Sequence, residues 1–334
     1  MSLPKVKIGP YSSSNVAFGG MNGLHVYEPL IEHKDFLHLL NTALDNGYTM
    51  IDTAAMYGFG VSEELISQVM HRRDEFTLAT KGVFSVDAKG KMIFSGNPDD
   101  LREHCHGSLK RLNTDFIDVY YLHRWDRRYA IEEQVGMLGR LVEEGKIGAI
   151  GLSEVSADTL RKAHKEHPIA AVQSEYSLWT RNPEIAVIEA CKELEAAFVA
   201  FSPVGRKFLS GELTDASQLP DWDFRSSMPR FDSDNLPGNL ELLKQFTALA
   251  DSIDLLPAEL AIAWVLAQGE HIIALPGTTN ETHLLQNAAA GRLQLDQVIL
   301  DKAGQIFNQD TVHGPRYSAK VQASVDTEMF TNGQ

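Results

Sequence analysis

The sequence predicts one α/β domain folded as a (β/α)8 TIM barrel, and three observations support this prediction. Eight short apolar runs rich in β-branched residues alternate with longer amphipathic stretches, from about residue 15 to about residue 290. This alternation is typical of parallel strands joined by helical crossovers, and its length suits a closed barrel. No G-x-G-x-x-G follows an early run, which argues against the runner-up, an open doubly wound sheet.

The eight apolar runs are the predicted strands of the barrel. In chain order they are NVAFGG at 15–20, YTMIDTA at 48–54, FTLATKG at 76–82, FIDVYYLHR at 116–124, IGAIGLSE at 147–154, AAVQSEY at 170–176, AFVAFSP at 197–203 and HIIALPG at 271–277. The carboxyl ends of barrel strands share one face, and active sites of such barrels lie there.

The stretches between the strands carry helix signals. The segment HKDFLHLLNTALDNG has apolar residues at helical spacing and ends on Gly47, a residue typical of a helix C-terminus. Two other segments open with Asn97–Pro98 and Asn182–Pro183. We expect each asparagine to cap a helix whose first residue is the proline.

Two segments interrupt the alternation: a long loop at about 204–238, after the seventh strand, and a tail from about 310. Neither resembles a separate domain, so residues 1–334 are predicted to form one domain. The barrel would span about 15–290, and a C-terminal helix and tail about 291–334. A long loop that follows a barrel strand is expected beside the mouth.

Composition excludes several classes of partner. The net charge of −15, from 30 Lys and Arg against 45 Asp and Glu, disfavours nucleic acid and acidic membrane surfaces. Two cysteines cannot build a disulfide framework, and the adjacent helical residues His104, Cys105 and His106 point in different directions, so no metal is predicted. The lack of a long apolar run or signal peptide predicts a soluble, cytoplasmic protein. A monomer is the default expectation, with an oligomer left open.

Four ionisable residues lie at or near the carboxyl ends of predicted strands. Asp52 ends the second strand, Tyr57 follows it by five residues, Lys81 ends the third and His123 ends the fourth. Taken singly, Asp52 could cap a helix and Tyr57 could be a half-buried aromatic residue. Lys81 could be a charge in a loop, and His123 a histidine of the core. Together they would be costly to bury without partners, so we expect them to pair around one site.

This quartet suits the reduction of a carbonyl group, whose developing alkoxide needs a proton. Tyr57 can donate it, and an adjacent Lys81 is expected to lower the pKa of the phenol from about 10 toward the working pH. Asp52 would keep Lys81 charged and oriented. His123 can donate a hydrogen bond to the carbonyl oxygen and orient it. The predicted partner is therefore a small-molecule carbonyl substrate.

The chain resembles the aldo-keto reductase superfamily over nearly its whole length. The motifs that carry the resemblance are IDTAAMYG, ATKG, LHRWD, GLSEVS, QSEYS, FSPVGRKFLSG and PGTTNETHLLQN. The segments PIAAVQSEYSLWTRNPE and HGPRY are most similar to a group of bacterial aldo-keto reductases and fungal pyridoxal reductases. The resemblance implies a catalytic tetrad at Asp52, Tyr57, Lys81 and His123. It also implies NADPH bound across the barrel mouth without a Rossmann motif.

The resemblance also implies which residues hold this cofactor. Ser153, Glu154 and Gln173 match positions near the nicotinamide amide, and Phe201 matches the aromatic residue that stacks on the ring. The remaining matches are Gly20 and Met21 at the end of the first strand, Ser202, Pro203, Val204 and Arg206 near the pyrophosphate, and Gly277, Thr278, Thr279, His283, Gln286 and Asn287 near the adenosine.

Two features depart from the family pattern. The second amide-binding position, often Asn, is Glu154 here. The segment TTNETH lacks the Lys or Arg that pairs with a 2′-phosphate in many relatives, so NADPH is expected but NADH use is left open. Arg206, Arg225 and Arg230 are candidate substitutes.

The sequence leaves three functions open. Reduction of a generic aldehyde or ketone is expected, and reduction of pyridoxal is an alternative that the group resemblance implies. The second alternative is a cofactor-bound sensing module, like the β subunits of voltage-gated potassium channels. Near the predicted mouth, Met56, Phe59, Phe84 and Trp125 are read equally well as pocket lining or as core.

Overall fold

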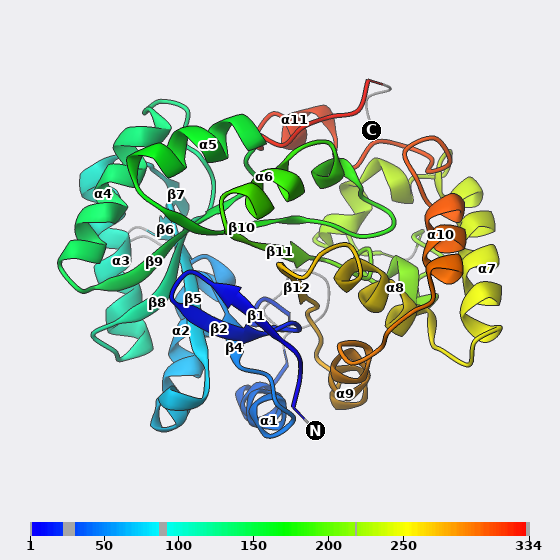
Figure 1. Ribbon diagram of the computed structural model, residues 1–334, viewed down its shortest axis with the longest axis horizontal. Coiled ribbons are helices and arrows are strands. Elements are labelled where there is room, and N and C mark those ends of the chain that lie inside the picture. The colour runs from blue at the N-terminus through cyan, green and yellow to red at the C-terminus, as the bar shows by residue number, and fades with distance from the viewer. Residues whose placement is uncertain (1, 23–30, 87–91, 218, 332–334) are drawn as a thin grey trace.

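The computed structural model describes residues 2–22, 31–86, 92–217 and 219–331, and within these ranges eight parallel strands form a barrel (Figure 1). They are β3 (Phe18–Gly19), β4 (Met50–Asp52), β5 (Thr77–Gly82), β8 (Ile117–Leu122), β9 (Ile147–Ser153), β10 (Ile169–Glu175), β11 (Ala197–Phe201) and β12 (Ile272–Leu275). Each pairs with the next, and a parallel bridge between Val16 and Ala274 joins the last strand to the first. The predicted barrel and its eight strands are therefore confirmed.

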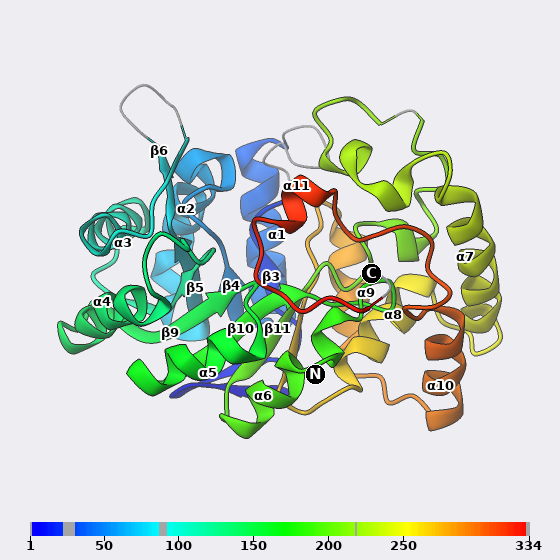
Figure 2. The ribbon, with the colours of Figure 1, turned by 90° about the horizontal axis from the view of Figure 1, so that it is seen from above.

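Helices surround the barrel (Figures 1 and 2). They are α1 (His33–Asp45), α2 (Val61–Ile66), α3 (Pro98–Leu112), α4 (Ile131–Glu143), α5 (Ala157–Glu166), α6 (Val187–Glu193), α7 (Leu236–Asp251), α8 (Pro257–Leu266), α9 (Glu281–Ala290), α10 (Gln297–Ile306) and α11 (Ala319–Gln322). Short 3-10 segments are η1 (Tyr57–Gly60), η2 (Ser67–Glu75), η3 (Asn182–Glu184), η4 (Phe208–Ser210), η5 (Phe224–Ser227) and η6 (Pro229–Phe231).

One of the two predicted asparagine caps is present and the other is not. The side chain of Asn97 accepts a hydrogen bond from the amide of Asp99 at 2.9 Å, so α3 begins as expected. The prediction for Asn182 is wrong, because this residue lies inside η3 and α6 begins only at Val187. Its buried amide instead donates to the carbonyl oxygen of Glu328 at 3.1 Å, which ties the C-terminal tail to this turn.

A hairpin that the sequence analysis did not predict precedes the barrel. It consists of β1 (Lys5–Ile8) and β2 (Tyr11–Ser14), and Figure 1 shows it in front of the barrel strands. Val6 and Ile8 are buried in the cluster that fills the barrel interior, together with inward-facing strand residues such as Val119 and Val199. The hairpin therefore closes the end of the barrel at which the strands begin, and leaves their carboxyl ends for a site.

A second hairpin follows β5, formed by β6 (Phe84–Val86) and β7 (Met92–Phe94). The C-terminal tail, red in Figure 2, passes over the barrel and is anchored at the start of α5. There the carboxylate of Asp326 accepts hydrogen bonds from the hydroxyls of Ser156 at 3.0 Å and Thr159 at 2.7 Å. A carboxylate at a helix N-terminus is favourable because the first amides lack partners within the helix.

No helix in the described part of the chain is long and apolar enough to cross a membrane.

The closing hairpin leads to a stability prediction. Ile8 is fully buried, so Ile8→Ala should lower the free energy of unfolding by about 2 to 5 kcal/mol through lost burial and an interior cavity. Lys7→Ala, in the same strand, removes only an exposed ion pair with Glu195 and should have a much smaller effect. Urea denaturation of both variants measures the difference. Equal losses would show that the hairpin does not pack into the barrel.

Candidate active site

A cavity of about 1700 Å³ opens at the carboxyl ends of the barrel strands. Its floor comes from strand ends, among them Asp52 on β4, Ser153 on β9, Gln173 on β10 and Phe201 on β11. Its walls come from the long loop after β11, the hairpin β6–β7 and the C-terminal tail. The predicted position of the long loop beside the mouth is therefore what the structure shows.

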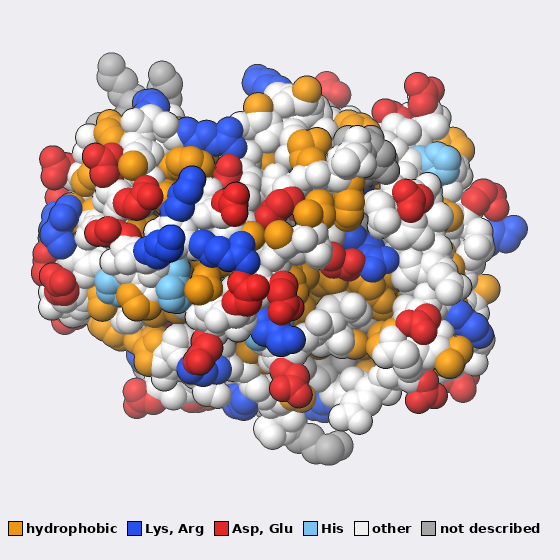
Figure 3. Space-filling model, turned by 45° about the horizontal axis from the view of Figure 1, so that its top comes forward, with side chains coloured by type: hydrophobic (Ala, Val, Ile, Leu, Met, Phe, Trp, Pro, Cys, Tyr) orange, Lys and Arg blue, Asp and Glu red, His pale blue; other side chains and the backbone are white. Residues whose placement is uncertain are grey.

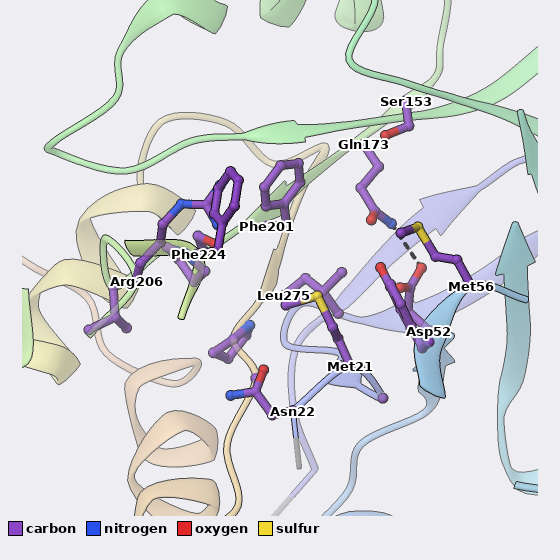
Figure 4. Close-up of a pocket in the computed structure, with 18 of the residues that line it drawn as sticks. Met21, Asn22, Asp52, Met56, Ser153, Gln173, Phe201, Arg206, Phe224 and Leu275 are labelled. Atoms are coloured by element: carbon purple, nitrogen blue, oxygen red, sulfur yellow. Dashed lines mark hydrogen bonds between the residues drawn. The ribbon is translucent and has the colours of Figure 1, made fainter. Parts of the chain in front are cut away.

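A buried ion pair lies at the base of this cavity. Lys81 Nζ donates to Asp52 Oδ1, and also to the carbonyl oxygen of Thr53 at 2.8 Å. The second oxygen of Asp52 accepts a hydrogen bond from Gln173 Nε2 at 2.8 Å (Figure 4). Neither charged side chain is more than 2% exposed. The pair is tolerated in the interior because each charge has its partner and further hydrogen bonds.

Tyr57 lies next to this pair, and its hydroxyl is 3.3 Å from Lys81 Nζ. Burial alone would lower the pKa of Lys81, but the charge of Asp52 raises it above its usual value. Lys81 is therefore an ammonium group at neutral pH. Asp52 and Tyr57 line the cavity, whereas Lys81 does not and acts on the cavity through the tyrosine.

The expected lowering of the tyrosine pKa is not observed. Burial of the phenol raises the pKa of Tyr57 above its usual value, and the opposing effect of Lys81 is smaller. The reason is that a phenolate loses more solvation in this site than one ammonium group returns, particularly with Asp52 also nearby. Tyr57 therefore keeps its proton at neutral pH and is ready to donate it.

His123 completes the quartet on the same wall. Its ring meets that of Tyr57 edge to face, with centroids 6.0 Å apart, and meets Phe84 in the same manner at 5.3 Å. Burial, together with the charges of Arg124 and Lys81, holds the pKa of His123 well below its usual range. The imidazole is therefore neutral and carries one N–H, which it can donate to an oxygen in the cavity.

Most of the residues assigned to the cofactor by resemblance line this one cavity. They are Gly20, Met21, Ser153, Gln173, Phe201, Ser202, Pro203, Val204, Arg206, Gly277, Thr278, Thr279, His283, Gln286 and Asn287. Figure 4 shows Asp52, Gln173 and Ser153 on one side, and Phe201, Phe224 and Arg206 on the other. The cavity is also lined by Met56, Phe59, Phe84 and Trp125. Of the two interpretations left open for these residues, pocket lining and core, the structure supports pocket lining.

Glu154 is the exception, because it does not line the cavity. Its carboxylate accepts from Arg316 Nη2 at 2.8 Å and belongs to a buried ionic cluster. Arg316 also donates to Glu175 at 3.1 Å, and Glu175 in turn accepts from Arg206. The Tyr317 hydroxyl lies 2.9 Å from Arg206 and 3.2 Å from Glu175. Arg316 and Tyr317 belong to the motif HGPRY, so this cluster binds the tail to the loop after β11.

The three arginines considered as substitutes for the missing basic residue differ in position. Arg206 and Arg225 line the cavity, and Arg225 is bound to Asp223 at 2.6 Å. Arg230 does not line it. Its guanidinium is buried and donates to Thr180 Oγ1 at 2.9 Å and to the carbonyl oxygen of Gly314 at 3.1 Å.

The sequence analysis missed several other residues of the cavity wall. They include Asn22, Met92, Phe94, Arg124, Lys207, Glu212, Phe224, Tyr317, Val321 and Val325. At the end near Thr278, Glu212 lies between two basic side chains, 3.1 Å from Lys207 Nζ and 3.3 Å from His283 Nε2. For the tail, the sequence signal was the motif HGPRY, which is part of the family resemblance.

Comparisons with known proteins identify one family. The model of the aldo/keto reductase family matches residues 15–303. The chain is 38% identical to a probable aldo-keto reductase 1 of Glycine max over 94% of this chain and 92% of that protein. It is also 38% identical to aldo-keto reductase yakc [NADP(+)] of Schizosaccharomyces pombe, over 95% of each.

A solved structure is similar over most of its length. The glycerol dehydrogenase AKR11B4 of Gluconobacter oxydans superposes with a TM-score of 0.82 at 26% sequence identity, covering 92% of this chain and 95% of that one. Most of this chain thus has a counterpart in an experimentally determined fold.

The ionic cluster leads to a prediction about pH. Burial alone would raise the pKa of Glu175, but Arg206 and Arg316 lower it from 4.5 to about 2. A carboxylate with a lowered folded-state pKa stabilises the protein above the unfolded value, and this contribution disappears as the pH falls from about 4.5 toward 2. Glu175→Gln should therefore lower the free energy of unfolding by about 3 kcal/mol at pH 7, and by progressively less below pH 4.5.

Urea denaturation between pH 7 and pH 3 measures this difference. Glu64→Gln, which replaces an exposed carboxylate on α2, is the control and should change the free energy of unfolding much less than Glu175→Gln does. A destabilisation by Glu175→Gln that stays constant over this range would contradict the assigned role of the cluster.

Proposed function

The chain belongs to the aldo/keto reductase family, and we propose that it reduces an aldehyde or ketone to an alcohol with NADPH as the hydride donor. One observation carries the proposal. A protonated Tyr57, an ammonium group 3.3 Å from its hydroxyl and a neutral His123 lie together at a single cavity. These are the groups that hold a carbonyl oxygen and deliver a proton to it.

Each residue of the site has a separate part in this chemistry. His123 donates its N–H to the carbonyl oxygen and orients it. Tyr57 gives its proton to the oxygen as negative charge develops there, and Lys81 stabilises the phenolate that remains. Asp52 keeps Lys81 charged and holds it in position through the ion pair. Asp52, Tyr57, Lys81 and His123 are therefore the proposed catalytic tetrad.

The cavity fits a dinucleotide, which would supply the hydride when bound. Its lining runs without a break from Asp52 to the segment between Gly277 and Asn287. The hydroxyl of Ser153 and the amide of Gln173 suit the nicotinamide amide, and the ring of Phe201 offers a stacking surface. Glu154 has no direct part in this proposal, since its carboxylate is held outside the cavity by Arg316.

NADPH is proposed over NADH for two reasons. The Schizosaccharomyces pombe relative carries NADP(+) in its name. In addition, Lys207 and His283 bring basic groups to the adenosine end of the cavity, where the segment TTNETH itself supplies no Lys or Arg. Basic groups there suit a 2′-phosphate, because charge-assisted hydrogen bonds to phosphate are strong.

The assignment of Tyr57 makes a direct prediction. Tyr57→Phe removes the proton donor and keeps the ring, so kcat/KM for aldehyde reduction should fall by about 10²- to 10⁴-fold while the Kd of NADPH changes little. Tyr129→Phe, at a tyrosine that does not line the cavity, is the matched control. Loss of absorbance at 340 nm and tryptophan fluorescence measure the two quantities. Comparable losses in both would contradict the role of Tyr57 as the acid.

The cofactor proposal is tested by titrating the protein with NADPH and then with NADH while tryptophan fluorescence is recorded. We expect quenching at lower concentrations of NADPH. Turnover is then followed with a panel of aldehydes that includes pyridoxal. Binding of NADPH without oxidation by any carbonyl would favour the alternative of a cofactor-bound sensing module, and binding of neither cofactor would contradict both.

A further inference from the structure

Five arginines line the cavity, and the structure distinguishes one of them. Four are paired with carboxylates: Arg127 with Asp326, Arg128 with Asp126, Arg206 with Glu175 and Arg225 with Asp223. Within residues 2–22, 31–86, 92–217 and 219–331, Arg124 forms no ion pair with a carboxylate. Its positive charge is half-buried in the wall directly after His123.

The hydrogen bonds of Arg124 use only one of its nitrogens. Nη1 donates to the carbonyl oxygen of His123 at 2.6 Å and to the hydroxyl of Ser153 at 3.1 Å. Nε and Nη2 have no hydrogen-bond acceptor in the described part of the chain. These two nitrogens form one edge of the planar guanidinium, and that edge matches the two oxygens of a carboxylate.

Other arginines of this chain use the same edge for this purpose. Arg72 binds Glu75 through Nε at 2.8 Å and Nη2 at 2.7 Å. Arg128 binds Asp126 at 2.8 and 2.6 Å, and Arg181 binds Glu184 at 2.8 and 2.7 Å, in the same way. The Nε–Nη2 edge of Arg124 is thus a carboxylate-binding edge that has no carboxylate from the described residues.

Arg124 is also close to the reacting groups. Its charge lowers the pKa of His123 and opposes the rise in the pKa of Tyr57, so the guanidinium acts electrostatically on both residues. An anion at Arg124 would therefore be near a carbonyl oxygen held between them. Met56, Phe84 and Trp125, which line the same cavity, are apolar or aromatic and offer no competing carboxylate.

We propose that Arg124 binds a carboxylate of the substrate, so that the preferred substrates are aldehydes or ketones that also carry a carboxylate group. This inference rests on the proposed carbonyl reduction and names its substrate class. A neutral substrate that fills the apolar part of the cavity would expel water from Arg124 and leave its donors unpaired. A substrate carboxylate would accept hydrogen bonds from these donors, and this difference favours carboxylate-bearing substrates over neutral ones.

The test compares each carboxylate with its own methyl ester, which has a similar shape and no charge. Suitable probes are the three formylbenzoates and 4-oxobutanoate, each beside its methyl ester. We expect the wild-type kcat/KM to favour the carboxylate of the best pair by on the order of 10- to 100-fold. Arg124→Met should remove this preference, so that the ratio of kcat/KM for carboxylate and ester falls to about 1 whatever the change in the rate common to both, and Arg124→Lys should retain part of it.

Two controls separate this role from others. Arg161→Met removes an exposed arginine of α5, paired with Glu193, and should leave both substrates unaffected. The Kd of NADPH, measured by fluorescence, should be unchanged in Arg124→Met. A weaker Kd, or equal losses for carboxylate and ester, would overturn the inference. Either result would assign Arg124 to the cofactor amide next to Ser153 or to the carbonyl oxygen.

Failure of the inference differs from failure of the proposed function. Reduction of the esters with no preference for the carboxylates would overturn the inference and leave carbonyl reduction intact. If no carbonyl compound is reduced, the proposed function fails, and binding of benzoate in the presence of NADP+ decides the role of Arg124. Quenching of tryptophan fluorescence by benzoate that persists in Arg124→Met would overturn the inference in that case too.

Discussion

The ion pair between Lys81 and Asp52 is the interaction on which the rest of the site depends. Two charges at the floor of a barrel are stable only when each is paired and hydrogen bonded, and Thr53 and Gln173 supply the remaining bonds. This requirement ties β4, β5 and β10 together at their carboxyl ends. It also places an ammonium group beside Tyr57, which partly offsets the rise that burial causes in the pKa of this phenol.

A second buried cluster extends this organisation to the mouth of the cavity. Glu175 continues β10 beyond Gln173 and binds Arg206 from the loop after β11 together with Arg316 from the tail. Loop and tail are therefore held by the strand that also supports Asp52. Glu154 belongs to the same cluster and does not line the cavity, whereas Ser153 and Gln173 do.

The distribution of charge in the cavity follows from these pairings. Most arginines that line the cavity form ion pairs with carboxylates of the protein, so their positive charge is largely neutralised within the wall. Lys207 and His283 lie at one end, both in contact with Glu212. Arg124 lies at the other end beside His123, without a carboxylate partner among the described residues. A molecule with phosphate groups at one end and a carboxylate-bearing partner at the other would complement this pattern. Figure 3 shows Lys and Arg side chains lying among Asp and Glu side chains on the face of the molecule that it draws.

Alternating apolar runs were sufficient to predict the eight strands and their order, and strand ends were sufficient to select Asp52, Tyr57, Lys81 and His123. Local pattern suffices there because parallel strands bring their carboxyl ends to one face. It could not predict the hairpin at Lys5–Ser14, the pKa of Tyr57 or the partner of Glu154. A short amphipathic strand has no distinctive signal, and burial and ion pairing depend on residues far apart in the chain, as Glu154 and Arg316 are. The sequence by itself thus determined the barrel and its ionisable residues. Only the tertiary structure decided their charge states and left Arg124 without a carboxylate from the residues that the structure describes, because solvent exclusion and pairing arise from packing.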